Sequence, residues 1–308
     1  MKMISNIVFT KNRPLQLEAY LESLYRYFPA EIIQTYVIYK VELFDEQYEL
    51  LFKKFPDCIV IKESDFHSDF MNMLSQINTK YILFGVDDVI YFESVDFNVI
   101  DETFNEFSGD IFGFSLRFGA ESIKGNNEPI SEVNIANQTI HRLNWTQGRT
   151  PTTRYPFELC ATVYLTELVK KIINSSMSNN LLLKKLFLPG STLTGILGKS
   201  KLKRKILKSF GYFYNPNTLE SWNCRWCQNH KKQLPANLYF QNFCASAVQV
   251  NIVNINEREK YEDLDEYTAE TLAEKYKQGY RLDIDYIARN RPMGTHSTKQ
   301  HFRLVKKF

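Results

Sequence analysis

The stretch YILFGVDD, residues 81–88, decides the predicted fold class of this 308-residue chain. Its first four residues are apolar and predict a short buried strand, which Gly85 brings to an end. Asp87 and Asp88 follow directly, so two carboxylates stand at the carboxyl end of that strand. Apolar residues 89–92 come next, which favours a functional pair of carboxylates over a plain polar turn.

Similar apolar runs recur on both sides of this stretch and alternate with segments of helical periodicity. Pro14 is well placed as the first residue of the helix that follows the first run. This alternation predicts a mostly parallel sheet with helices on both faces, whose ligands bind beyond the carboxyl ends of the strands. Asn12 and Arg13 would lie at that edge, as would Asp87 and Asp88. The expected strands are residues 4–10, 35–39, 58–61, 81–84, 111–118 and 245–253, and the expected helices are residues 14–28, 44–55, 66–77, 157–173, 218–231 and 268–277.

The composition predicts a soluble globular protein, with 44% hydrophobic and 24% charged residues. The formal net charge of +3 is too small to indicate a nucleic-acid partner. No stretch approaches the roughly 20 apolar residues that cross a bilayer, and no signal peptide is recognisable at the start. We therefore expect a cytoplasmic protein, or one peripheral to the inner face of a membrane, with its five cysteines reduced.

Adjacent carboxylates at the end of a strand suit a hard divalent cation. Mg²⁺ and Mn²⁺ prefer oxygen ligands and commonly bridge to substrate phosphates. A metal held by Asp87 and Asp88 would neutralise the charge of a departing diphosphate. The sequence therefore predicts a metal site directly after the strand at residues 81–84.

Two segments resemble the GT-A-fold glycosyltransferases, especially the bacterial family-2-like group. Residues 7–14 (IVFTKNRP) are similar to their opening strand and first helix, and residues 81–88 are similar to their Asp-x-Asp segment. Val86 stands where the first aspartate of that segment is usual. The resemblance therefore implies that Asp88 is the direct metal ligand, whereas Asp87 acts through water or contacts the ribose.

The resemblance also implies the reaction. It implies a GT-A (Rossmann-like) catalytic fold, a nucleoside-diphosphate sugar donor, with a UDP-sugar favoured, and Mn²⁺ or Mg²⁺ as cofactor. The sugar would pass to a glycan or lipid-linked acceptor, in bacterial surface polysaccharide or glycolipid synthesis. Thr10, Asn12 and Arg13 would lie near the nucleotide together with Asp87. Arg117 would meet phosphate or acceptor, and its alternative role is a charge paired with a nearby acid.

Inverting transfer needs a carboxylate that takes the proton of the acceptor hydroxyl. Glu158 is the first candidate, because it follows residues 155–157 (YPF) and is expected to begin a helix, where the related enzymes place their base. Its alternative role is electrostatic support of that helix end. Glu220 is the second candidate.

Two further residues complete the expected site. By the same resemblance, His296 in a late loop-like segment is a candidate metal ligand, with His301 as the alternative, although a solvated side chain is the simpler interpretation of either. Trp145 is the candidate for stacking on the acceptor sugar. It lies in residues 119–153, which are rich in Asn, Gly, Pro and Thr and are expected to form a long surface loop.

The expected organisation is one catalytic domain with a helical C-terminal extension. Residues 1–255 would form the GT-A domain, with residues 1–120 as the nucleotide-sugar half and residues 121–255 as the acceptor half. A mobile basic segment near residues 195–210 would contact an anionic membrane surface or form a solvated face. Residues 256–308 would form the extension and tail.

Three alternatives stay open from the sequence. The chain could be an inactive GT-A-like module that binds a nucleotide sugar or glycan. It could also be a nucleotidyltransferase, although the segment after the first strand is not Gly-rich. Cys224, Cys227, His230 and Cys244 could form a zinc site, but their spacing is not that of a common finger, and reduced core thiols are favoured.

Overall fold

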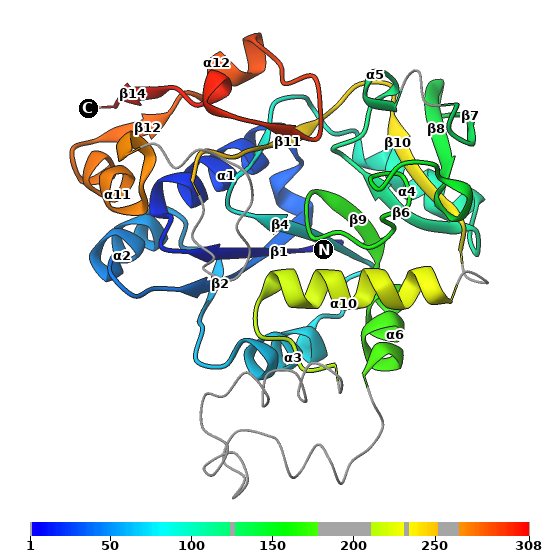
Figure 1. The fold of residues 1–308 in the computed structure, drawn as a ribbon, viewed down its shortest axis with the longest axis horizontal. Coiled ribbons are helices and arrows are strands. Elements are labelled where there is room, and N and C mark those ends of the chain that lie inside the picture. Colours follow the sequence, from blue (N-terminus) through cyan, green and yellow to red (C-terminus); the bar gives the residue numbers. More distant parts are fainter. Residues whose placement is uncertain (1, 124–126, 178–210, 231–233, 252–264, 308) are drawn as a thin grey trace, which may run out of the picture.

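A computed structural model describes residues 2–123, 127–177, 211–230, 234–251 and 265–307. A nine-stranded sheet runs through the molecule with helices on both faces (Figure 1). The predicted mostly parallel α/β architecture is therefore confirmed. In sheet order the strands are β3 (Ile59–Lys62), β2 (Ile33–Lys40), β1 (Ile4–Lys11), β4 (Tyr81–Val86), β9 (Thr162–Leu165), β6 (Ile111–Ser115), β10 (Ala236–Phe240), β8 (Gln138–Asn144) and β7 (Ile130–Ile135).

Two strands run against the rest of the sheet. β1 to β4 pair in parallel, and β10 is parallel to β6. β9 lies between β4 and β6 and is antiparallel to both, and β8 is antiparallel to its two neighbours. The helices are α1 (Pro14–Tyr27), α2 (Asp45–Lys54), α3 (Phe66–Gln76), α4 (Phe97–Glu106), α5 (Ala120–Ile123), α6 (Thr166–Ser176), α10 (Pro216–Asn229), α11 (Ala269–Lys277) and α12 (Ile284–Arg289).

The two faces of the sheet have separate cores. Side chains of β1 alternate between them, with Val8 packed toward α1, α2 and α4, and Ile7 and Phe9 packed toward α3, α6 and α10. Because both faces are covered, β1 and β4 are buried along almost their whole length, and each contains a continuous apolar run, residues 7–9 in β1 and residues 81–84 in β4. This is why β1 and β4 were recognisable as short apolar runs.

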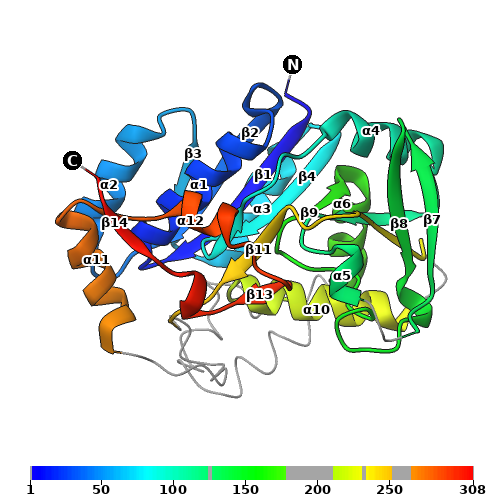
Figure 2. The ribbon, with the colours of Figure 1, turned by 90° about the horizontal axis from the view of Figure 1, so that it is seen from above.

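The C-terminal segment packs on α1. Leu272 and Tyr276 of α11 join Leu15 and Ala19 of α1 in a third core. The segment holds helices, as expected, and also short strands: β12 (Tyr280–Leu282) pairs with β14 (Leu304–Lys306), and β13 (His296–Ser297) pairs with β11 (Ala245–Val248), whose other neighbour is β5 (Val89–Tyr91). Figure 1 and Figure 2 show α11 beside α2, and both views place α11 and β14 at the end of the molecule away from β7 and β8.

The prediction of a long surface loop at residues 119–153 is wrong. The central part of this stretch, residues 130–144, is the β7–β8 hairpin, which extends the sheet. The two-residue turn of the hairpin at Ala136 and Asn137 has positive φ at both positions, 46° and 62°. Such turns match the twist of the strands that they join. Polar residues on the exposed positions of β7 explain why the hairpin resembled a loop.

The helix expected at residues 157–173 begins later than predicted. Residues 162–165 form strand β9, and α6 starts only at Thr166. Thr162, Val163 and Tyr164 are β-branched or aromatic and are buried between two strands, so packing decides in favour of a strand. α4, β5 and β10 were not predicted at all, although Asp96 caps α4 with its side chain.

Two observations bear on the membrane. In the part of the chain that the structure describes, no helix combines the length and apolarity needed to cross a bilayer. The basic segment near residues 195–210 lies outside the described residues, so its expected membrane contact stays a prediction.

Gly85 is packed so tightly that a side chain should not fit. A Cβ built there would lie 2.1 Å from the hydroxyl oxygen of Tyr20, which is fully buried and donates to Asn6 Oδ1 at 2.6 Å. We expect Gly85→Ala to lower the free energy of unfolding by about 1–3 kcal/mol through overpacking, measured by urea denaturation. Gly294→Ala is the control, since its Cβ would meet no atom closer than 3.8 Å. Equal midpoints for the two variants would contradict this packing argument.

Candidate active site

The carboxyl ends of β1 and β4 bring Arg13 to the aspartate pair. In the parallel register Phe9 lies opposite Val86, and the Asp87 amide donates to the Phe9 carbonyl at 3.2 Å. The chain then turns at Asn12, whose positive φ of 53° lets α1 begin directly at Pro14. Residues that the sequence separates widely thus meet at one edge of the sheet, as predicted for this topology.

Arg13 forms ion pairs with both aspartates. Its Nη1 lies 2.9 Å from Asp87 Oδ1 and 3.5 Å from Asp88 Oδ2, and all three residues are buried. Burial raises the pKa of Asp87, the Arg13 charge opposes that rise, and the charge of Asp88 adds to it. Asp88 Oδ1 is buried and has no hydrogen-bond partner among the described residues. Asp88 therefore keeps one carboxylate oxygen, Oδ1, that the Arg13 guanidinium does not contact.

Thr10 and Asn12 support the turn that carries Arg13. Thr10 Oγ1 lies 2.9 Å from the Tyr48 hydroxyl, which also accepts from the Arg13 amide at 3.0 Å. Asn12 exchanges hydrogen bonds with Glu42, accepting from its amide at 3.0 Å and donating to its carboxylate at 3.4 Å. In this structure both predicted nucleotide contacts therefore hold the loop that follows β1.

A second charged cluster lies at the same edge. Arg117 follows β6 and Glu158 precedes β9, and because β9 is reversed, the residues before it lie beside the residues after β6. Arg117 Nη2 pairs with Glu158 Oε2, and both side chains are buried. Glu158 also accepts from Thr162 Oγ1 and, at 3.3 Å, from Ser115 Oγ. The expectation that Glu158 begins a helix is wrong, since it lies in the loop before a strand.

Glu220 reaches this cluster from α10. Asn215 and Thr218 form a capping box that fixes the start of the helix, and Glu220 lies in its second turn. The pKa of Glu220 is raised to about 7, because burial and the charge of Glu158 raise it more than Arg117 and a hydrogen bond from Tyr155 lower it. The two carboxylates proposed as alternatives for one role are therefore neighbours.

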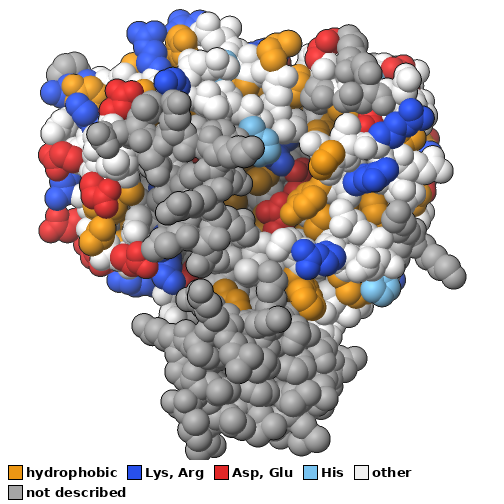
Figure 3. Space-filling view, viewed as in Figure 1, with side chains coloured by type: hydrophobic (Ala, Val, Ile, Leu, Met, Phe, Trp, Pro, Cys, Tyr) orange, Lys and Arg blue, Asp and Glu red, His pale blue; other side chains and the backbone are white. Residues whose placement is uncertain are grey.

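Cys160 connects the two clusters. Its carbonyl accepts from Arg117 Nε at 3.1 Å. Burial raises the pKa of its thiol well above the ordinary value, Arg117 opposes that rise, and the charges of Glu220, Glu158 and Asp88 add to it. Hydrogen bonds of β11 also connect the clusters, because the Val248 amide donates to the Asp88 carbonyl at 2.7 Å and the Thr295 carbonyl accepts from both the Ala247 amide and Arg117 Nη1, at 3.1 Å and 3.2 Å. Figure 3 shows acidic side chains in a depression near the centre of this face, with a histidine and basic side chains beside them.

His296 lies near Arg117 and Glu158 and does not complete a metal site with the aspartates. His296 is exposed at the surface, and partial desolvation together with the Arg117 charge lowers its pKa to about 4, against the opposing charge of Glu158. Among the described residues, no three His, Cys, Asp or Glu side chains form a group that could hold a metal. The expected set of two aspartates and one histidine is therefore not brought together. His301, the alternative, has its Nδ1 against Ser297 Oγ.

Trp145 does not lie where an acceptor sugar could stack on it. Only 2% of its surface is exposed, its ring packs edge-on against Phe112, and its Nε1 donates to the Leu234 carbonyl at 2.9 Å. The prediction of an acceptor contact rested on a surface loop, which is in fact the end of the β7–β8 hairpin. The structure corrects it to a core residue.

The cysteine–histidine group is structural as well. Cys224 and Cys227 lie on the buried face of α10 and pack into the core, and His230 stacks on Trp226. With Cys244 packed in the core of the opposite face, the described residues bring no zinc site together here. The favoured interpretation of reduced core thiols agrees with this arrangement, and all five cysteines are free.

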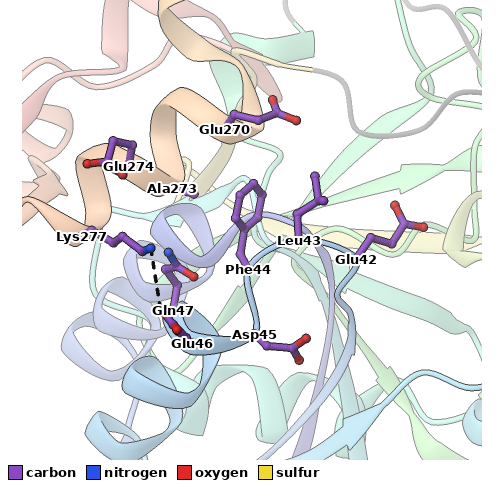
Figure 4. Close-up of a pocket in the computed structure, with 10 residues that line it drawn as sticks. All are labelled: Glu42, Leu43, Phe44, Asp45, Glu46, Gln47, Glu270, Ala273, Glu274 and Lys277. Atoms are coloured by element: carbon purple, nitrogen blue, oxygen red, sulfur yellow. Dashed lines mark ion pairs between the residues drawn. The ribbon is translucent and has the colours of Figure 1, made fainter.

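A pocket of about 430 Å³ lies apart from these clusters, between the loop after β2 and α11 (Figure 4). Its charged lining is almost entirely acidic, and its one lysine, Lys277, pairs with Glu46 at 3.7 Å. Carboxylates repel phosphate, so this pocket does not suit a diphosphate. The lining residues are Glu42, Leu43, Phe44, Asp45, Glu46, Gln47, Glu270, Ala273, Glu274 and Lys277.

Several residues of the site were not foreseen from the sequence. Asn251 accepts from Arg13 Nη2 through its carbonyl, and Thr295 accepts from Arg117 Nη1 at 3.2 Å. Both contacts come from the second half of the chain and use backbone oxygens, which any residue type supplies. Only the three-dimensional arrangement reveals such positions.

Comparison with known proteins gives one curated relative and several solved structures. No model of a known protein family matches the chain. The bifunctional glycosyltransferase pgtA of Dictyostelium discoideum is 26% identical over 191 residues, 54% of this chain and 24% of the relative, so the chain spans about a quarter of its length.

Among solved structures, S. aureus TarS 1–349 in complex with UDP is 16% identical, with a TM-score of 0.40, over 68% of this chain and 55% of that chain. The mannosyltransferase PcManGT of Pyrobaculum calidifontis, in complex with GDP-Man and Mn²⁺, is 12% identical, with a TM-score of 0.30, over 39% of this chain and 36% of that chain.

Proposed function

We propose that the chain is a glycosyltransferase that moves a sugar from a nucleoside-diphosphate donor to an acceptor hydroxyl. One observation carries the proposal: an aspartate pair after β4 and a pair of glutamates lie at the carboxyl edge of a mostly parallel sheet, and the charges of Asp88 and of both glutamates act on the thiol of Cys160. The first pair suits the donor and the second suits the acceptor. The similarity to a glycosyltransferase of Dictyostelium discoideum supports this reaction class.

Glu220 is the proposed general base, which reverses the order of the two candidates. A base works best when its pKa lies near the working pH, and the pKa of Glu220 is raised to about 7. Glu158 forms a buried ion pair with Arg117 and also accepts from Thr162 and Ser115, so it is suited to holding the guanidinium in place. In this scheme Glu220 takes the proton of the acceptor hydroxyl, and Glu158 positions Arg117.

The transfer then balances as a single displacement with inversion. The acceptor oxygen forms its bond to the anomeric carbon as that carbon's bond to the diphosphate oxygen breaks, and the nucleoside diphosphate leaves with the bonding electrons. Arg117 and Arg13 are the cations of the site, and positive charge near the leaving group stabilises the negative charge that develops there. A glycan or lipid-linked acceptor and a role in bacterial surface polysaccharide or glycolipid synthesis stay predictions.

The donor set fits a divalent metal in part. Asp88 Oδ1 is a buried carboxylate oxygen without a partner, which is the type of ligand that Mg²⁺ or Mn²⁺ prefers. Asp88 would hold the ion and Asp87 would assist, while diphosphate and water would supply the other ligands. When bound, the ion would stabilise charge on the departing diphosphate.

One observation favours a second candidate, a binding module without turnover. Arg13 already offsets part of the negative charge of the aspartate pair, so a nucleotide could bind there without a metal to assist its departure. The same edge would then recognise a nucleotide sugar or glycan only.

Product analysis distinguishes the candidates. The chain would be incubated with Mn²⁺ and a panel of UDP- and GDP-sugars, and released phosphates would be separated by ion-exchange chromatography. A glycosyltransferase releases nucleoside diphosphate, and slow donor hydrolysis gives this signal even without the acceptor. A parallel incubation would contain nucleoside triphosphate and sugar phosphate. Release of pyrophosphate from these two reactants would instead indicate a nucleotidyltransferase. Saturable binding of a donor with neither product would indicate the binding module.

A further inference from the structure

The guanidinium of Arg13 lies where a cation at the aspartate pair is expected. Its Nη1 contacts carboxylate oxygens of both aspartates, at 2.9 Å and 3.5 Å. All three side chains are at most about a tenth exposed, so solvent screens their charges weakly. One positive charge thus faces two negative charges in a buried place.

The contacts of Arg13 are uneven. Nη2 donates to the Asn251 carbonyl, and Asn251 is held in turn by its donation to the Tyr267 carbonyl at 2.8 Å. The Nε atom is buried without a partner among the described residues. The guanidinium is therefore anchored at one edge by Asn251, and its contact with Asp88, at 3.5 Å, is the longer of its two ion pairs.

The unpartnered Asp88 Oδ1 gives a second, independent sign that a cation belongs here. A buried carboxylate oxygen normally has a partner, and the guanidinium contacts only the other oxygen of Asp88. A divalent ion on Oδ1 would lie close to the guanidinium and be repelled by it. The ion and Arg13 would therefore compete for the same two negative charges.

We propose that Arg13 is an internal counter-cation of the aspartate pair, which a divalent metal displaces from Asp88. This inference rests on the proposed function, because it assumes a metal at the aspartates. Arg13 is then a positioning residue that sets metal affinity: it offsets part of the negative charge of the pair before the metal and the nucleotide arrive. Released from Asp88, its charge faces the place proposed for the diphosphate.

Manganese titration of variants tests the proposal without any activity assay. Free Mn²⁺ would be followed by electron paramagnetic resonance for the wild type, Arg13→Gln and Arg13→Lys, all without nucleotide. Arg13→Gln should bind Mn²⁺ about tenfold more tightly, because it removes the competing charge. Arg13→Lys disturbs the same contacts but keeps that charge, so its affinity should stay within about threefold of the wild type. Equal affinities for wild type and Arg13→Gln would overturn the inference.

Asp88→Asn separates failure of this inference from failure of the proposed metal site. If that variant binds Mn²⁺ as the wild type does, the metal site itself is wrong. If it loses Mn²⁺ while Arg13→Gln gains no affinity, only the competition is wrong.

Removal of Arg13 leaves two buried carboxylates facing each other, so folding needs its own measurement. Thermal unfolding with and without Mn²⁺ should show a larger stabilisation by the metal in Arg13→Gln than in the wild type. If the variant does not fold in either condition, a wild-type crystal soaked with Mn²⁺ decides. Anomalous density at Asp88 with Arg13 moved away supports the proposal, and metal with Arg13 still on both aspartates refutes it.

Discussion

Replacing Glu220 with Gln is expected to lower kcat for sugar transfer by a factor of about 10²–10⁴, the usual contribution of a general base. The amide keeps the shape of the side chain and cannot take the acceptor proton. Donor binding should change little, because the diphosphate side of the site rests on Arg13 and the aspartates. Initial rates at saturating donor, together with calorimetric titration of the nucleoside diphosphate, measure both quantities.

The pH profile makes this test specific. A base must be deprotonated to act, so kcat/KM of the wild type should rise with pH through about 7, the raised pKa of Glu220, and then level off. Glu220→Gln should lose this rise.

Glu158→Gln is the matched control. Because the charge of Glu158 raises the pKa of Glu220, its removal should shift the rise in kcat/KM to lower pH without abolishing it. If Glu220→Gln keeps the rise and Glu158→Gln loses it, the roles of the two glutamates are exchanged.

Glu220→Gln should also be no less stable than the wild type at pH 8. A carboxyl whose pKa is raised in the folded state binds its proton more tightly there than in the unfolded chain. Its contribution to stability therefore falls as pH rises from the unfolded pKa, near 4.5, to the folded value of about 7. An uncharged amide removes this penalty. If Glu220→Gln loses both activity and structure, misfolding explains the loss of activity, and the result does not support Glu220 as the general base.

Replacing Glu18 with Ala should give the largest loss of stability, about 3 kcal/mol, because it breaks a buried ionic group. The Glu18 side chain is 1% exposed and lies 2.7 Å from both Lys54 Nζ and Arg281 Nε. It also accepts from the Tyr276 hydroxyl. These partners come from α2, α11 and β12, so one carboxylate on α1 holds three other elements.

Urea denaturation measures this loss, and limited proteolysis shows where it acts. The C-terminal segment, residues 265–307, should become the first site of cleavage, because two of the lost contacts hold it to α1. Glu22→Ala is the control: its side chain is 17% exposed and pairs with Lys54 and Lys307, so its loss should cost much less. An equal effect of the two variants would argue against a special role for Glu18.

The sequence predicted the half of the molecule in which local pattern and topology agree. β1 to β4 are short apolar runs separated by amphipathic helices, so their alternation defines a parallel sheet. The position of Asp87 and Asp88 at the carboxyl edge followed from that. The pairing of Arg13 with both aspartates was not predicted, although it follows from the β1–β4 register once the sheet is known.

The second half was harder to predict because tertiary packing overrides the local pattern there. The four residues of β9 lie in an apolar stretch that fits a helix equally well, and only burial between two strands selects the strand. Trp145 was misplaced because its polar neighbours, on the exposed positions of a hairpin, resemble a loop. Glu158 was placed at a helix start for the same reason: the reversed strand in front of α6 was not recognised.

The reversed strand β9 also determines the order in which the molecule can be completed during synthesis. The strands β3, β2, β1 and β4 are neighbours in this order at one end of the sheet, and their pairing with one another needs no later strand. They can therefore assemble as soon as residues 4–86 have left the ribosome. The exposed edge of β4 then stays unpaired until residues 162–165 have been made, and among the described strands it is β9 that joins β4 to β6. Such long-range pairing slows folding. The nascent chain therefore carries its aspartates on an open sheet edge long before the glutamates arrive, and this interval is when strand-to-strand association between nascent chains is most to be expected.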